Sequence, residues 1–175
     1  MSLLKRLFGR REPDAGTVAL YGRIVARARE PVFYASLGVP DSPEGRFDLL
    51  VLHAFLVMDA LSQTQPQAAQ SLFDLMFDDM EVNLRELGAS DIRIGARVKS
   101  LAQDFFGRSE AYRNALVDKD KPALMAALDR NLFAKKAAEA AHLALLADYM
   151  SAAWGREAVA EGEFPPIPTP LKASP

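Results

Sequence analysis

The sequence predicts an all-α protein, an irregular bundle of about six or seven helices. Three observations carry this prediction. Apolar residues recur at helical spacing from Pro13 to Gly155, polar cap residues and prolines mark several helix starts, and no alternating pattern of useful length indicates a strand. The chain has 175 residues, of which 50% are hydrophobic and 25% charged, and this is typical of one globular domain.

The first helix is expected to begin after Asp14, whose side chain can cap it, and to run to about Glu30. Pro31 is expected to end this helix, because proline cannot continue the hydrogen-bonded turn. Residues 32–40 are predicted to form an irregular packed connection, since no nearby segment could pair with a strand.

A second helix is expected over Pro43–Gln63. Asp41 and Ser42 precede it as cap residues, and proline is well tolerated in a first helical turn. Residues 49–61 are apolar on nearly every side of this helix. The sequence therefore predicts that it is the central and most buried helix. This apolar run is too short for the ~20 residues of a bilayer span.

The rest of the chain predicts further helices separated by glycine, proline or polar caps. Gly88 is expected to be a C-cap, and Gly107 to break one helix into two. The expected ranges are 66–87, 92–106, 109–117, 122–133 and 135–154. Repeated prolines after Gly162 predict an extended or disordered tail. The chain is thus divided into a basic amphipathic segment (1–12), a helical domain (13–161) and a Pro-rich tail (162–175).

The N-terminal segment is amphipathic when it is wound as a helix, with four apolar side chains on one side and basic residues around them. The predicted membrane-contact residues are Leu3, Leu4, Lys5, Arg6, Leu7, Phe8, Arg10 and Arg11. Weak, reversible binding to an anionic membrane surface is one interpretation. A turn docked on the protein's own core is the other, and the sequence leaves both open. No secretory signal pattern is present, so we expect a location inside the cell.

Several kinds of chemistry have no support in the sequence. The chain has no cysteine, and its pI near 5.7 argues against a nucleic-acid partner. His53 and His142 lie in apolar helical runs without partners at metal-ligand spacing, and are expected to be core or interface residues. Asp78 and Asp79 match only part of a magnesium-binding motif, so an acidic helix face with a Glu81–Arg85 pair is the better interpretation. We expect no enzyme activity, metal or cofactor.

Methionine and phenylalanine are plentiful on the predicted helices, as in Met58, Met76, Phe73 and Phe77. At a surface, flexible thioethers and rings would form an adaptable groove for apolar partner helices. For most of these residues ordinary core filling is the alternative. An exposed apolar patch would distinguish the two.

The stretch from Phe73 to Lys99 resembles the ubiquinol–cytochrome c chaperone family, as do Phe105–Arg108 with Tyr112, and Leu128–Phe133. The sequence departs from the family pattern only locally, at Arg93 and Gly95. The resemblance implies an assembly factor that binds newly made cytochrome b before this subunit joins the bc1 complex. It further implies a bacterial relative, cytoplasmic and peripherally placed at the inner-membrane face, with the ribosome or the membrane insertion machinery as further expected partners.

The residues and the resemblance together predict a client-binding face on the helix that begins at Pro66, with two arginines orienting its acidic groups. The candidate client-binding residues are Phe73, Met76, Phe77, Asp78, Asp79, Met80, Glu81, Arg97 and Arg108. Apolar positions would contact client helices, and carboxylates would meet basic client loops. Two alternatives stay open: a small all-α enzyme of prenyl or lipid chemistry, and a helical adaptor.

Overall fold

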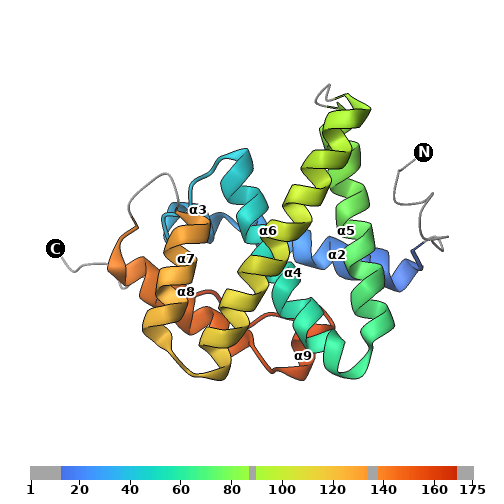
Figure 1. Cartoon of the computed structure of the whole chain (residues 1–175). Helices are drawn as coiled ribbons and strands as arrows, with labels where there is room; N and C mark the ends of the chain where they lie inside the picture. Colours follow the sequence, from blue (N-terminus) through green and yellow to red (C-terminus); the bar gives the residue numbers. More distant parts are fainter. Residues whose placement is uncertain (1–12, 87–89, 134–137, 169–175) are drawn as a thin grey trace.

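The computed structural model describes residues 13–86, 90–133 and 138–168, and these ranges contain helices and no strands. The helices are α2 (Ala15–Ala28), α3 (Pro31–Ala35), α4 (Pro43–Thr64), α5 (Pro66–Glu86), α6 (Asp91–Val117), α7 (Lys121–Leu132), α8 (Ala140–Ala153) and α9 (Glu157–Ala160). Six of them have at least 12 residues, and α3 and α9 are short. The predicted all-α bundle is confirmed (Figure 1).

Helix α4 is the centre of the bundle and contacts α2, α5, α6, α7 and α9. Its N-terminus is capped as predicted, because the Ser42 side chain accepts a hydrogen bond from the Gly45 amide at 3.2 Å. Among the described residues, α4 alone is long and apolar enough to cross a membrane, but 61% of that stretch is buried by the rest of the protein. Its apolar length therefore supplies the core, as the sequence predicts.

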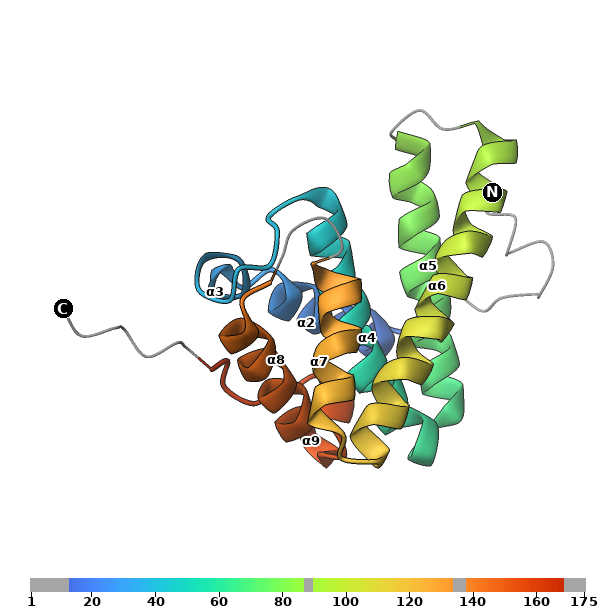
Figure 2. The same cartoon turned by 60° about the vertical axis from the view of Figure 1, so that its left-hand side comes forward.

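Helices α5 and α6 lie side by side, and the end of α5 and the start of α6 project beyond the other helices in both views (Figures 1 and 2). The predicted break at Gly107 is wrong, because α6 runs without interruption from Asp91 to Val117. One glycine inside a helix costs only about 1 kcal/mol. Packing of the buried rings of Phe105 and Tyr112 on either side outweighs that cost. The predicted C-cap at Gly88 lies outside the described residues.

Three shorter segments also differ from the predictions. Pro31 starts the five-residue helix α3, so part of the predicted irregular connection is helical. Helix α8 begins at Ala140 and not at Lys135, because Glu139 has extended backbone. Helix α9 was not predicted, since four residues are too few to give a periodic pattern. For α8, the high alanine content of the sequence predicts a longer helix than the structure contains.

Residues 163–168 are not helical, and the first of them pack against the bundle. The ring of Phe164 meets the imidazole of His53 edge to face at 5.1 Å. Arg27 donates a hydrogen bond to the carbonyl of Pro165. The start of the Pro-rich region therefore closes over the core, while the predicted separation of a tail stays a prediction.

His53 is a core histidine, as predicted, and it is completely buried. Its Nδ1–H donates to the Leu49 carbonyl at 2.7 Å, and its Nε2 lies 3.0 Å from the hydroxyl of Tyr149. Burial raises the pKa of Tyr149 to about 12, so the phenol keeps its proton and its O–H donates a hydrogen bond to Nε2. Burial lowers the pKa of His53 to about 3, which keeps the ring neutral.

Candidate functional site

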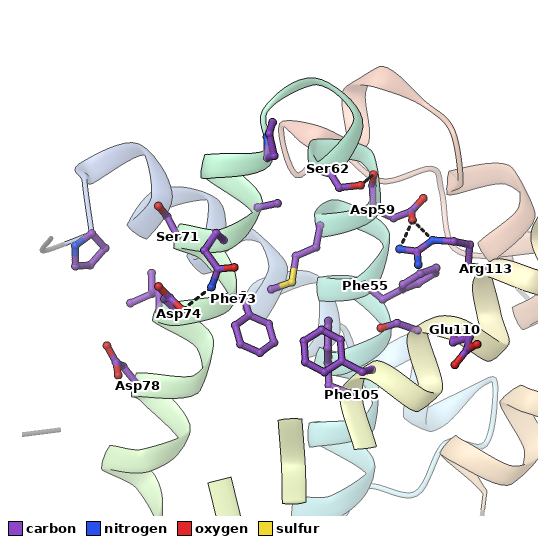
Figure 3. Close-up of a pocket in the computed structure, with 18 of the residues that line it drawn as sticks. Phe55, Asp59, Ser62, Ser71, Phe73, Asp74, Asp78, Phe105, Glu110 and Arg113 are labelled. Atoms are coloured by element: carbon purple, nitrogen blue, oxygen red, sulfur yellow. Dashed lines mark hydrogen bonds and ion pairs between the residues drawn. The ribbon is translucent and has the colours of Figure 1, made fainter. Parts of the chain in front are cut away.

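The candidate site is an open cleft of about 1500 Å³ between α4, α5 and α6, with the residues just before α2 at its edge (Figure 3). Its lining residues are Pro13, Asp14, Phe55, Met58, Asp59, Ser62, Pro66, Ala69, Gln70, Ser71, Phe73, Asp74, Leu75, Asp78, Phe105, Phe106, Ser109, Glu110, Arg113 and Asn114. The helices that form it are adjacent in sequence, but no single stretch contains the site. The volume is large enough for a peptide segment and not only for a small molecule.

Aromatic side chains dominate the apolar part of the cleft. Phe55 and Phe105 are buried, Phe73 is half-buried, and Phe106 is 59% exposed. The rings of Phe73 and Phe106 stack with centroids 5.4 Å apart, and Phe105 meets Phe73 edge to face at 5.7 Å. A large exposed ring on top of an aromatic cluster is the kind of surface that a partner covers.

The rim of the cleft is acidic. Five of its described lining residues are carboxylates and one, Arg113, is a cation. The carboxylates are Asp14, Asp59, Asp74, Asp78 and Glu110. Hydrogen bonds from Thr17 lower the pKa of Asp14, so this rim group is ionised at neutral pH. The electrostatic potential of the cleft therefore favours positively charged ligands.

Asp59 fixes one wall of the cleft. Its carboxylate receives hydrogen bonds from the Arg113 guanidinium at 2.7 Å and from the Trp154 indole at 2.8 Å. The Arg113 guanidinium also lies 5.9 Å from the centre of the Phe55 ring. These contacts join α4, α6 and the end of α8, so this wall of the cleft is preformed.

The cleft also contains a buried polar group. Ser109 is 6% exposed, and its hydroxyl has no hydrogen-bond partner among the described residues. An unsatisfied buried hydroxyl is costly. A polar group of a bound segment would remove that cost if it reached the hydroxyl.

The predicted client-binding residues do not form one cluster. Phe73 and Asp78 line the cleft. Met76, Phe77, Met80 and Glu81 are buried, so the expected exposure of their side chains is wrong. The cause is that α2, α4 and α6 all pack against α5 and cover most of its apolar face. For these apolar side chains, core filling is the correct interpretation.

The polar members of the predicted site are also dispersed. The carboxylate of Asp79 accepts a hydrogen bond from the Tyr21 hydroxyl at 2.8 Å and joins α5 to α2. Arg85 pairs with Glu81 at 2.9 Å, as predicted, although the Glu81 side chain is only 3% exposed. Arg108 pairs with Asp48 of α4, while Arg97 is exposed nearer the start of α6. Neither arginine lines the cleft, and their role in orienting acidic groups stays a prediction.

Phe105 and Phe106 line the cleft but were not among the predicted client-binding residues. Phe105 is buried and Phe106 is exposed, because adjacent residues on a helix point about 100° apart and these two rings face different sides of α6. Glu110 and Arg113 follow Phe106 one and two turns later on the same helix. The predicted membrane-contact residues 3–8, 10 and 11 lie outside the described residues.

The family of this chain follows from comparison with known proteins. The sequence pattern described as ubiquinol-cytochrome C chaperone matches residues 35–159. The crystal structure of the Cbp3 homolog from Brucella abortus is similar over 93% of this chain and 95% of that chain, with 36% sequence identity and a TM-score of 0.74. No curated protein matches the chain in sequence. The pattern covers well over half of the chain and the structural likeness nearly all of it, so the protein belongs to the ubiquinol–cytochrome c chaperone family.

Proposed function

We propose that this protein is an assembly chaperone that binds newly made cytochrome b and holds it until the subunit joins the bc1 complex. The cleft between α4, α5 and α6 is the proposed client site. Family membership supports the chaperone role. The exposed ring of Phe106, stacked on Phe73 beside an acidic rim, is the observation that carries the choice of site.

The chemistry of the client supports this choice. A membrane subunit presents apolar helices, and its cytoplasmic loops are enriched in lysine and arginine. The aromatic floor suits the apolar part, and the four lining carboxylates other than Asp59, which pairs with Arg113, suit the basic part. Before insertion into the complex, both parts of the client lack their final partners.

The expected affinity is moderate, which a chaperone needs because the client must leave. Complete burial of one phenylalanine side chain contributes roughly 1.5–3 kcal/mol. Exposed charge pairs on the rim add less, about 0–1 kcal/mol each. Binding through one exposed ring and a charged rim is therefore reversible and depends on salt.

We also propose that the protein works peripherally at the cytoplasmic face of the inner membrane, near the ribosome or the insertion machinery. The four basic residues of segment 1–12 and the apolar Leu3, Leu4, Leu7 and Phe8 support this. Each basic residue near an anionic leaflet contributes about 1 kcal/mol. Replacing Leu7 and Phe8 together by serine should move the protein to the soluble fraction. Unchanged fractionation would contradict the anchor.

The client site is tested by co-purification from cells that make cytochrome b. Phe106→Ser should lower recovery of cytochrome b about ten-fold, since ~1.5–3 kcal/mol corresponds to ten-fold or more in affinity. Val117→Ser is the matched control, because Val117 is a 58% exposed apolar residue of the same helix outside the cleft. Both variants should keep the melting temperature of the unmodified protein.

The rim is tested by charge reversal in the same assay. Glu110→Lys should lower recovery, and the loss should shrink as salt is raised. Asp104→Lys is the control, since Asp104 is an exposed carboxylate of α6 that does not line the cleft. Equal recovery with all four variants would exclude the cleft as the client site.

A further inference from the structure

The start of the described chain lies at the cleft. Pro13 and Asp14, the first described residues, are both part of its lining. Residues 1–12 are therefore joined to the described chain at the cleft. Twelve residues span ~18 Å as a helix and up to ~40 Å when extended, so the segment can reach across an opening formed by three helices.

The composition of this segment complements the cleft. Residues 1–12 contain four cations and one carboxylate, and the cleft lining contains five carboxylates and one cation. The segment's apolar side chains, Leu3, Leu4, Leu7 and Phe8, match the exposed aromatic floor. An apolar face and positive charge are the two features of a ligand that favour binding in this cleft.

We propose that residues 1–12 of this chain bind in the cleft when neither client nor membrane is present. Tethering makes this feasible with weak contacts, because a short linker holds a ligand at an effective concentration of about 1 mM. The segment then covers Phe73 and Phe106 and places its basic residues against the rim.

Binding in the cleft excludes binding to a membrane. The same four apolar residues cannot face the aromatic floor and the lipid at the same time. An anionic membrane that captures the segment therefore empties the cleft. This part of the inference rests on the proposed function, and it means that the chaperone accepts client preferentially at the membrane surface.

The chain offers a direct probe of this contact. Trp154 is its single tryptophan, and the indole donates to Asp59 in the wall of the cleft. The chain also has no cysteine, so Ser2→Cys carries a dansyl label at a single site in the full-length protein. Energy transfer from Trp154 to the dansyl group reports whether the segment lies in the cleft.

We expect strong transfer in buffer, and at least a two-fold loss when Phe106→Ser is introduced. Val117→Ser should leave the transfer unchanged, because this exposed residue lies outside the cleft. Vesicles that contain an anionic lipid should lower the transfer, whereas neutral phosphatidylcholine vesicles should not. Equal transfer in the two variants would overturn the proposal.

A second measurement does not depend on the label. A fluorescent peptide with the sequence of residues 1–12 should bind the Leu7→Ser, Phe8→Ser chain about ten-fold more tightly than the unmodified chain, because in that variant the cleft is open. Equal affinity for the two chains would contradict docking of the segment. Circular dichroism and melting temperature confirm that each variant is folded.

These readouts separate the two proposals, because neither uses client. Transfer that responds to Phe106→Ser, with undiminished capture of cytochrome b, would support docking of the segment and refute the cleft as the client site. Loss of capture without any change in transfer or peptide affinity would refute docking and leave the proposed function intact.

Discussion

The carboxylate of Asp59 and the guanidinium of Arg113 lie 2.7 Å apart and join α4 to α6 at the edge of the cleft. The two partners differ in environment, because the Asp59 side chain is 10% exposed and the Arg113 side chain 47%. The Trp154 indole donates to the second oxygen of Asp59 at 2.8 Å. The buried carboxylate of Asp59 thus binds the charged guanidinium of Arg113 and the neutral indole of Trp154.

Asp59→Ala should lower the free energy of unfolding by about 1–3 kcal/mol, mainly because the indole of Trp154 loses its acceptor. The lost ion pair contributes less, since the exposed guanidinium can be hydrated. Urea denaturation measures the change. Asp104→Ala is the control, as Asp104 is an exposed carboxylate of α6, and its effect should stay below about 0.5 kcal/mol. Equal effects of the two substitutions would contradict a structural role for Asp59.

The helix starts could be predicted because their causes are local. The side chains of Asp14, Ser42 and Asp120 each accept a hydrogen bond from an amide three residues later. Such cap residues are visible in sequence. The continuity of α6 through Gly107 was not visible, because it depends on burial of Phe105 and Tyr112 against other helices. Where the local sequence signal is weak, tertiary packing determines whether a helix continues.

The sequence predicts the chemical character of the cleft but not which residues form it. The sequence indicates aromatic groups beside acidic groups, and the structure does bring the two together. Periodicity shows which residues of α5 share a face, but it does not show which neighbours cover that face. Phe77 therefore lies in the core, while Phe106, on the next long helix, provides the exposed ring.

The contrast between these two phenylalanines gives a prediction of stability. Phe77→Ala should lower the free energy of unfolding by about 3–5 kcal/mol, because it leaves a cavity at a residue that is 1% exposed. Phe106→Ala should change it by less than about 1 kcal/mol, since the ring is 59% exposed. Thermal and urea denaturation of both variants check this. A larger loss for Phe106→Ala would mean that its ring is part of the core.

The buried imidazole of His53 predicts a pH dependence. Burial lowers its pKa to about 3 in the folded protein, whereas an unfolded chain has a histidine pKa near 6.5. Between these values the unfolded state binds a proton that the folded state does not. His53 thus reduces stability by about 1.4 kcal/mol per pH unit as the pH falls below 6.5.

Urea denaturation between pH 7 and pH 4 measures this slope, and His53→Gln is the comparison. The variant should be less stable at pH 7, because the contact with Tyr149 is altered, but its stability should fall less steeply with decreasing pH. The carboxylates titrate in both proteins. The difference between the two curves of stability against pH therefore gives the contribution of His53. Parallel curves would show that His53 does not stay neutral in the folded protein.

Two glycines in helices should respond oppositely to alanine. At Gly107 an added Cβ would meet nothing within 4 Å, so Gly107→Ala should raise the free energy of unfolding by about 0.5–1 kcal/mol through higher helix propensity. At Gly45 the Cβ would lie 2.0 Å from the Pro40 carbonyl oxygen, so Gly45→Ala should lower it by about 1–3 kcal/mol. Urea denaturation of both variants measures the changes. Because a helix break at Gly107 would remove the gain, destabilisation by Gly107→Ala would contradict a continuous α6.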